Sequence, residues 1–178
     1  MKKPVEWIRS WFTAKQETLV IDQAKITEIL PHQEKWALVQ SVAITDGKAV
    51  GELVLGEDIC RGHVIAGVLI PPGCIWYDAA AQLLGVILHQ DQEVLSRLGP
   101  NKMLGASGYG PSEFRRPFHP GDKIIIETTT EVDYDDRHGF FRVSGGKFYL
   151  KLPGEKRARV TIDSVTLTPM SKEDLLRG

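Results

Sequence analysis

The sequence predicts an α+β domain in which antiparallel strands wrap around one buried helix. The segment 73–89 is almost wholly apolar, so a helix there must be buried on most of its sides. Short β-type runs bounded by turn residues lie before and after this segment, as is typical of antiparallel strands. A long apolar helix among such strands requires a sheet that curves around it.

The chain has 178 residues, of which 42% are hydrophobic, and this is enough to form one sizeable core. We expect a single domain over residues 22–170, a helical extension over 1–21 and a C-terminal tail over 171–178. Within the extension, residues 5–12 place apolar groups on one helical face. The basic face expected of a membrane-binding helix is thin, which favours a helix lying on its own domain or on a second copy.

The remaining elements follow from caps and turns. Asp22 can cap a short helix that ends near Leu30, before a proline. The runs 37–44 and 50–55 flank an Asp46-Gly47 pair, which predicts a hairpin. The last third of the chain alternates strands and turns: 123–132, a turn at 135–136, 140–150, a turn at 153–154, and 158–167.

The charge balance and the cysteines limit the partners and the compartment. Lys and Arg total 22 against 23 Asp and Glu, with no long block of one sign, so a broad nucleic-acid-binding surface is not expected. Two cysteines, Cys60 and Cys74, are too few to staple such a domain and indicate free thiols in a reducing compartment. The N-terminus lacks the apolar core of a signal peptide, of about 7–15 residues. We expect a cytoplasmic protein.

A membrane span is not expected in this chain. The apolar run 73–88 is shorter than the ~20 residues that a spanning helix needs. It also carries Asp78 and Gln82. A carboxylate and an amide in an apolar helix are more typical of a functional or hydrogen-bonded site in a protein core.

Asp78 and His63 form the most informative pair in the sequence. Pro72-Gly73 precedes the helix, whose first N–H groups and positive dipole end can stabilise a carbonyl oxygen that gains negative charge. Gln82 lies four residues after Asp78, on the same helical face, and can orient its carboxyl group. The imidazole of His63 can accept a proton near neutral pH. This combination suits β-elimination next to a carbonyl, although a turn histidine and a structural acid remain open alternatives.

The order of several motifs resembles the (3R)-3-hydroxyacyl-acyl-carrier-protein dehydratases of the FabA/FabZ type. The resemblance covers about residues 22–168, and the order of the motifs is more specific than any one of them. The matching segments are 29–39 (Ile-Leu-Pro-His-Gln-Glu-Lys-Trp-Ala-Leu-Val), Gly62-His63 with Gly67, Pro72-Gly73-Cys74, 78–82 (Asp-Ala-Ala-Ala-Gln), 114–117 (Phe-Arg-Arg-Pro) and 120–122 (Pro-Gly-Asp).

This resemblance implies a hot-dog fold, in which a curved antiparallel sheet wraps one long helix, and a homodimer or a trimer of dimers. His63 matches the catalytic histidine, which removes the C2 proton of a 3-hydroxyacyl thioester. Asp78 matches the acid that protonates the departing hydroxyl, and the two residues come from opposite subunits. The Gly73 N–H matches the group that binds the thioester oxygen. The product is a trans-2-enoyl thioester, as in fatty-acid biosynthesis.

Other residues receive supporting roles in this interpretation. Gly67, Cys74 and Gln82 are expected to line the substrate site. Arg115, Arg116 and Lys123 are expected to dock an acidic acyl carrier protein. His32 is expected to fix a loop. No metal or other cofactor is expected, because the Cys60-x-x-His63 spacing supplies two ligands without a second nearby pair.

The loop after His63 departs from the family pattern. It reads His63-Val64-Ile65-Ala66-Gly67, so the family's proline is missing and one extra residue separates His63 from Asp78. Moving an imidazole by about 1 Å can cost on the order of 10²-fold in rate. Two alternatives therefore stay open, an acyl-thioester hydrolase and a non-catalytic acyl-binding subunit, both on the same fold.

Overall fold

The computed structural model describes residues 18–32, 36–98, 102–135, 142–171 and 173, and a long helix lies at its centre. This helix, α3 (Cys74–Leu88), confirms the helix predicted over 73–89. Its residues 79–88 are all buried. The expected helix over residues 5–12 lies outside the described residues. No helix in the described ranges is long and apolar enough to cross a membrane.

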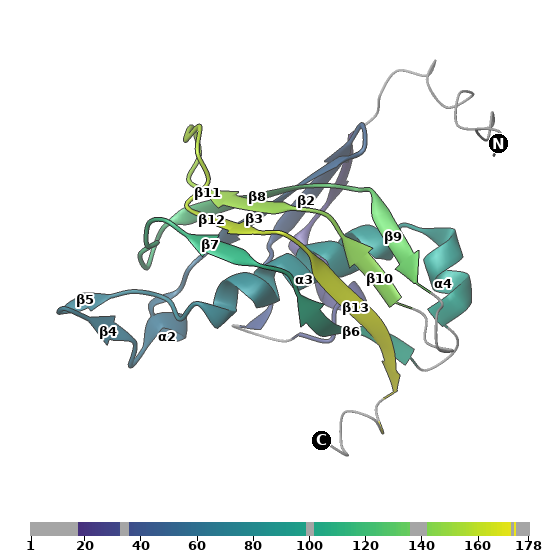
Figure 1. Cartoon of the computed structure of the whole chain (residues 1–178), viewed down its shortest axis with the longest axis horizontal. Coiled ribbons are helices and arrows are strands. Elements are labelled where there is room, and N and C mark those ends of the chain that lie inside the picture. Colours follow the sequence, from purple (N-terminus) through teal and green to yellow (C-terminus); the bar gives the residue numbers. More distant parts are fainter. Residues whose placement is uncertain (1–17, 33–35, 99–101, 136–141, 172, 174–178) are drawn as a thin grey trace.

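A seven-stranded antiparallel sheet lies over α3 (Figure 1). Its edge strand is β1 (Leu19–Ile21), which pairs with β2. Residues 19–21 therefore belong to the sheet, although 1–21 was expected to be an extension that precedes the domain. The predicted hairpin at Asp46-Gly47 is confirmed as strands β2 and β3. The strand order is β1, β2 (Ser41–Thr45), β3 (Lys48–Val54), β8 (Lys123–Thr129), β11 (Phe148–Lys151), β12 (Val160–Ile162) and β7 (Ser112–Phe114).

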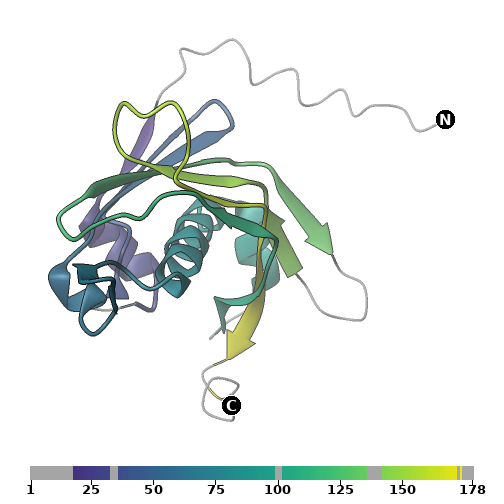
Figure 2. The same cartoon turned by 60° about the vertical axis from the view of Figure 1, so that its left-hand side comes forward.

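A second sheet of four strands continues the first one. Its strand order is β9-β10-β13-β6. Each of these strands is next along the chain to the strand at the corresponding position of the series β8-β11-β12-β7 in the first sheet. The two sheets are therefore one sheet that bends sharply, and Figure 2 shows its strands arching over α3. The four strands are β9 (Val132–Asp135), β10 (Arg142–Gly145), β13 (Val165–Ser171) and β6 (Lys102–Tyr109).

The bend divides three segments that were predicted to be continuous strands. The 123–132 run holds β8 and the first residue of β9, the described part of the 140–150 run holds β10 and β11, and the 158–167 run holds β12 and the start of β13. Gly145 is the last residue of β10, where the chain bends toward β11. A Cβ added at this position would come within 2.8 Å of Leu84 Cδ1 on α3. A glycine at this point lets the sheet approach the helix closely.

Three short helices complete the described fold. The expected cap is confirmed, because the Asp22 carboxylate accepts a hydrogen bond of 3.0 Å from the Lys25 N–H at the start of α1 (Gln23–Ile29). The second, α2 (Glu57–Cys60), leads directly to His63, and α4 (Gln92–Leu98) follows the end of α3.

Candidate active site

His63 lies at the base of a small hairpin formed by β4 (Val64–Ile65) and β5 (Val68–Leu69). Its Nδ1 is 2.9 Å from the carbonyl oxygen of Ile70. Since a carbonyl oxygen only accepts hydrogen bonds, Nδ1 carries the proton of the neutral ring. Nε2 is then the nitrogen with a free lone pair, and it is available to accept a proton.

The unusual loop length is taken up by the tip of this hairpin. Ala66 and Gly67 form the turn, both with positive φ, and the Ile70 N–H closes the base on the His63 carbonyl oxygen at 3.2 Å. This backbone hydrogen bond and the ring hydrogen bond join the same two residues. The hairpin therefore holds His63 from its base, whatever the length of its tip.

His63 lines a cavity of about 280 Å³ with Gly73, at the start of α3, and Trp76. The positive end of the α3 dipole lies at the Gly73 end of the helix, where it favours negative charge on a bound oxygen. The cavity is mainly apolar apart from two arginines, and its other walls come from Ile70, Pro71, Phe114, Arg115, Arg116, Pro117, Phe118 and Val160. Of the other predicted substrate residues, Gly67 and Cys74 do not line it.

Asp78 is held by Gln82, as the four-residue spacing predicted. The Gln82 side-chain NH₂ donates to Asp78 Oδ2 at 3.1 Å and to the Trp36 carbonyl oxygen at 2.7 Å. Its Oε1 accepts the N–H groups of Leu38, at 2.9 Å, and Val39, at 3.3 Å. Two backbone donors at Oε1 fix the orientation of the amide, so its NH₂ must face the acid. Gln82 is only 1% exposed, and it contacts the acid and the backbone.

Two further side chains lie near Asp78, and the sequence predicted neither of these neighbours. His32 Nε2 lies 3.4 Å from Asp78 Oδ1. Tyr109 of β6 packs against Tyr77 with tilted rings whose centroids are 4.8 Å apart, and burial together with the nearby Asp78 charge raises the pKa of the Tyr109 phenol. Pro31-His32 was part of a recognised motif, whereas nothing in the sequence pattern marked Tyr109.

Within one chain, the side chains of His63 and Asp78 lie on different sides of α3. Trp76 lines the His63 cavity, and Asp78 follows it by two residues, which corresponds to about 200° around a helix. Asp78 therefore points away from this cavity, toward His32 and Tyr109. One chain contains the predicted acid and the predicted base but does not bring them together.

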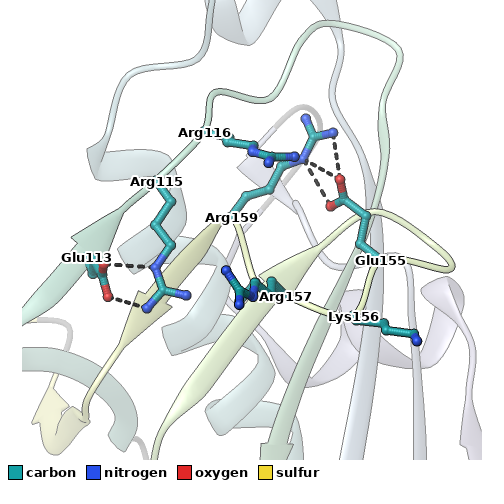
Figure 3. Close-up of a pocket in the computed structure, with 8 residues that line it drawn as sticks. Glu113, Arg115, Arg116, Glu155, Lys156, Arg157 and Arg159 are labelled. Atoms are coloured by element: carbon teal, nitrogen blue, oxygen red, sulfur yellow. Dashed lines mark hydrogen bonds and ion pairs between the residues drawn. The ribbon is translucent and has the colours of Figure 1, made fainter.

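A strongly basic hollow of about 770 Å³ adjoins the His63 cavity (Figure 3). Arg115 and Arg116 line both spaces. Arg115 forms a two-pronged ion pair with Glu113, at 2.8 and 2.6 Å, and these hydrogen bonds lower the pKa of the Glu113 carboxyl. The remaining walls come from the β11–β12 connection: Glu155, Lys156, Arg157, Ala158 and Arg159.

Three cations in this hollow have no ion pair within the described ranges: Arg116, Lys156 and Arg157. Arg159, by contrast, pairs with Glu155 at 2.9 Å, and its guanidinium lies 5.3 Å from the centre of the Phe118 ring. The predicted docking residue Lys123 is not brought into the hollow. It pairs with Glu52 at 2.9 Å, across strands β3 and β8.

The arrangement of one long buried helix under a curved antiparallel sheet is the hot-dog fold, and solved dehydratases share it. A chain of the dehydratase heterocomplex ApeI:P from Xenorhabdus doucetiae superposes with a TM-score of 0.58 at 16% identity, over 85% of this chain and 95% of that one. The dehydratase domain from the CurJ module of curacin polyketide synthase gives a TM-score of 0.59 at 12% identity, over 96% of this chain and 55% of that one. The predicted α+β hot-dog class is thereby confirmed.

Curated relatives narrow this class to one family. The 3-hydroxyacyl-acyl-carrier-protein dehydratases FabZ of Escherichia coli O9:H4 (strain HS) and Erwinia tasmaniensis are each 31% identical to this chain over 137 residues, or 75% of this chain and 85% of the relative. No family model matches the sequence. The chain belongs to the FabZ family of 3-hydroxyacyl-acyl-carrier-protein dehydratases, as the motifs predicted.

Proposed function

We propose that this protein dehydrates (3R)-3-hydroxyacyl thioesters to trans-2-enoyl thioesters. The observation that carries the proposal is the His63 ring, which is held through Nδ1 and leaves Nε2 free in a cavity beside the start of α3. Membership of the FabZ family supports the same reaction.

In the proposed reaction, His63 Nε2 takes the proton from C2 of the substrate. The electron pair of that C–H bond forms the C2–C3 double bond as the C3–O bond breaks. Asp78 gives its proton to the departing hydroxyl, which leaves as water. The Gly73 end of α3 stabilises the negative charge that develops on the thioester oxygen.

The site is proposed to form between two copies of the chain. This is supported by the separation of His63 and Asp78 on different faces of α3. Strands β6 and β7 end the two sheets and pair on one side only within the described part of the chain. Pairing of this edge with that of a second copy would bring the second copy's His63 toward Asp78. The exposed apolar side chains of Val64, Ile65 and Val68 beside His63 also suit coverage by a second copy.

The thioester is proposed to arrive on an acyl carrier protein. The basic hollow contains cations that have no ion pair with any described residue, next to the His63 cavity, and this arrangement suits the phosphate of a pantetheine arm together with an acidic protein surface. Arg115 and Arg116 are kept from the original docking prediction. Lys156 and Arg157 take the place that was given to Lys123.

The central test incubates the purified protein with a 3-hydroxyacyl thioester and follows enoyl and free-thiol formation separately. We expect the enoyl product from wild type, no measurable turnover from His63→Ala or Asp78→Asn, and normal turnover from His119→Ala, a control at an exposed histidine. Free thiol without the enoyl product would instead identify a hydrolase. Bound acyl groups without any turnover would identify the non-catalytic subunit.

A further inference from the structure

His32 is a side chain in contact with Asp78 that the proposed reaction does not use. It follows Pro31 after the end of α1, far from Asp78 along the chain, and its Nε2 lies 3.4 Å from Asp78 Oδ1. The two side chains are 31% and 35% exposed, so their contact lies at the border between core and solvent. A role limited to fixing the loop after α1 does not account for this contact with Asp78.

The carboxyl group of Asp78 has two unlike oxygens. Oδ2 receives a hydrogen bond from the Gln82 NH₂, whose orientation is fixed by the Leu38 and Val39 N–H groups. An oxygen that faces an N–H donor serves best as an acceptor, so the proton of the acid lies on Oδ1, which can donate it in a hydrogen bond to Nε2 of a neutral His32. Oδ1 is the oxygen next to His32 Nε2.

The two ring nitrogens of His32 are also unlike. Nδ1 is buried and has no hydrogen-bond partner in the part of the chain that the structure describes. Nε2 is therefore the ring nitrogen that makes the polar contact, and this contact goes to Asp78. Among the described residues, Gln82, from the same helix, also bonds Asp78, and the charge of Asp78 acts on Tyr109, from β6.

We propose that His32 is a positioning residue for Asp78, and that its Nε2 holds Oδ1 in the orientation needed for proton donation. This inference rests on the proposed function, because orienting an acid matters only if the acid reacts. Gln82 fixes one oxygen of the carboxyl group and His32 fixes the other. Together they prevent rotation about the bond that joins the carboxyl group to its side chain.

A matched pair of substitutions separates this role from a loop-fixing one. His32→Gln keeps a nitrogen at the same number of bonds from the backbone as Nε2, whereas His32→Asn keeps one only at the place of Nδ1. We expect His32→Asn to lower kcat by about 10-fold to 100-fold with little change in KM, since misplacement of a reacting group costs rate on this scale. His32→Gln should restore most of the turnover.

Equal turnover of His32→Asn and wild type would overturn the proposal, and so would better turnover of His32→Asn than of His32→Gln. Thermal unfolding of both variants checks that the fold is kept. His89→Asn, at an exposed histidine that follows α3, is the control for general effects of the substitution.

A measurement without substrate separates this inference from the proposed function. The ¹⁵N resonance of His32 Nε2 should move when Asp78 is replaced by Asn, and that of His89 should not. An unmoved His32 resonance would contradict the contact itself, even in an active enzyme. Wild type that forms no enoyl product would refute the proposed function and, with it, the catalytic role of His32, while the resonance would still decide whether the pair exists.

Discussion

The Nδ1 atom of His63 lies 2.9 Å from the carbonyl oxygen of Ile70, and the Ile70 N–H returns a hydrogen bond to the His63 carbonyl oxygen. Each of these residues therefore fixes the other across the base of the β4–β5 hairpin. Main-chain atoms of this hairpin therefore orient the ring of His63, the proposed base.

The first prediction concerns the tautomer of His63. We expect the neutral ring to carry its proton on Nδ1, because the Ile70 carbonyl oxygen accepts from it. ¹⁵N NMR on histidine-labelled protein, assigned with His63→Ala, can measure this. A neutral ring protonated mainly on Nε2 would remove the structural argument for His63 as the base.

The second prediction concerns Gln82. Gln82→Leu leaves the buried N–H groups of Leu38 and Val39 without their side-chain acceptor. Each buried polar group left unpaired costs about 1–3 kcal/mol, so we expect the free energy of unfolding to fall by at least about 2 kcal/mol. Denaturant titration measures the loss. Gln90→Leu is the control, because Gln90 is exposed and, among the described residues, its amide bonds only the Val86 carbonyl oxygen.

The third prediction concerns the bend between β10 and β11. Gly145→Ala would place a methyl group 2.8 Å from Leu84 Cδ1, closer than atoms pack, and we expect a destabilisation of about 1–3 kcal/mol. Gly108→Ala on β6 is the matched control, because its nearest neighbour would be 3.8 Å away. Equal melting temperatures for the two variants would mean that the sheet can move away from α3 at little cost.

The fourth prediction concerns the basic hollow. Replacing both Lys156 and Arg157 with Gln should raise KM for an acyl-carrier-protein thioester by about 10-fold at low salt, and less at high salt, because the effect is electrostatic. The same variant should process an N-acetylcysteamine thioester, which has no phosphate, at the wild-type rate. Lys123→Gln, outside the hollow, should leave both substrates unchanged. Loss of both activities would argue against a docking role.

The central features of the fold were accessible from the sequence because they depend on local signals. The apolar run after Pro72-Gly73 predicted α3, and Asp46-Gly47 predicted the β2–β3 hairpin. The hydrogen bond from Gln82 to Asp78 followed from their spacing on one helical face. These signals need no knowledge of the tertiary structure.

The remaining strands depend on their neighbours. Strand β6 contains Gly105, Ala106, Ser107 and Gly108, which have weak strand preference, and its pairing with β13 makes it a strand. The break after Gly145 was missed although Gly145-Gly146 is a dipeptide typical of a turn or a break. What the sequence could not show is the close approach to Leu84, on a helix that comes much earlier in the chain. The contact between His32 and Asp78 likewise joins segments that only the folded chain brings together.

The Gln82 amide gives the site a further property. Since it joins Asp78 to the main chain at 36–39, the place of Asp78 depends on backbone atoms that every substitution other than one to proline preserves. The side chains around the His63 cavity take no part in this attachment. The walls of this cavity can therefore be redesigned, or diverge in evolution, while the proposed proton donor stays where it is.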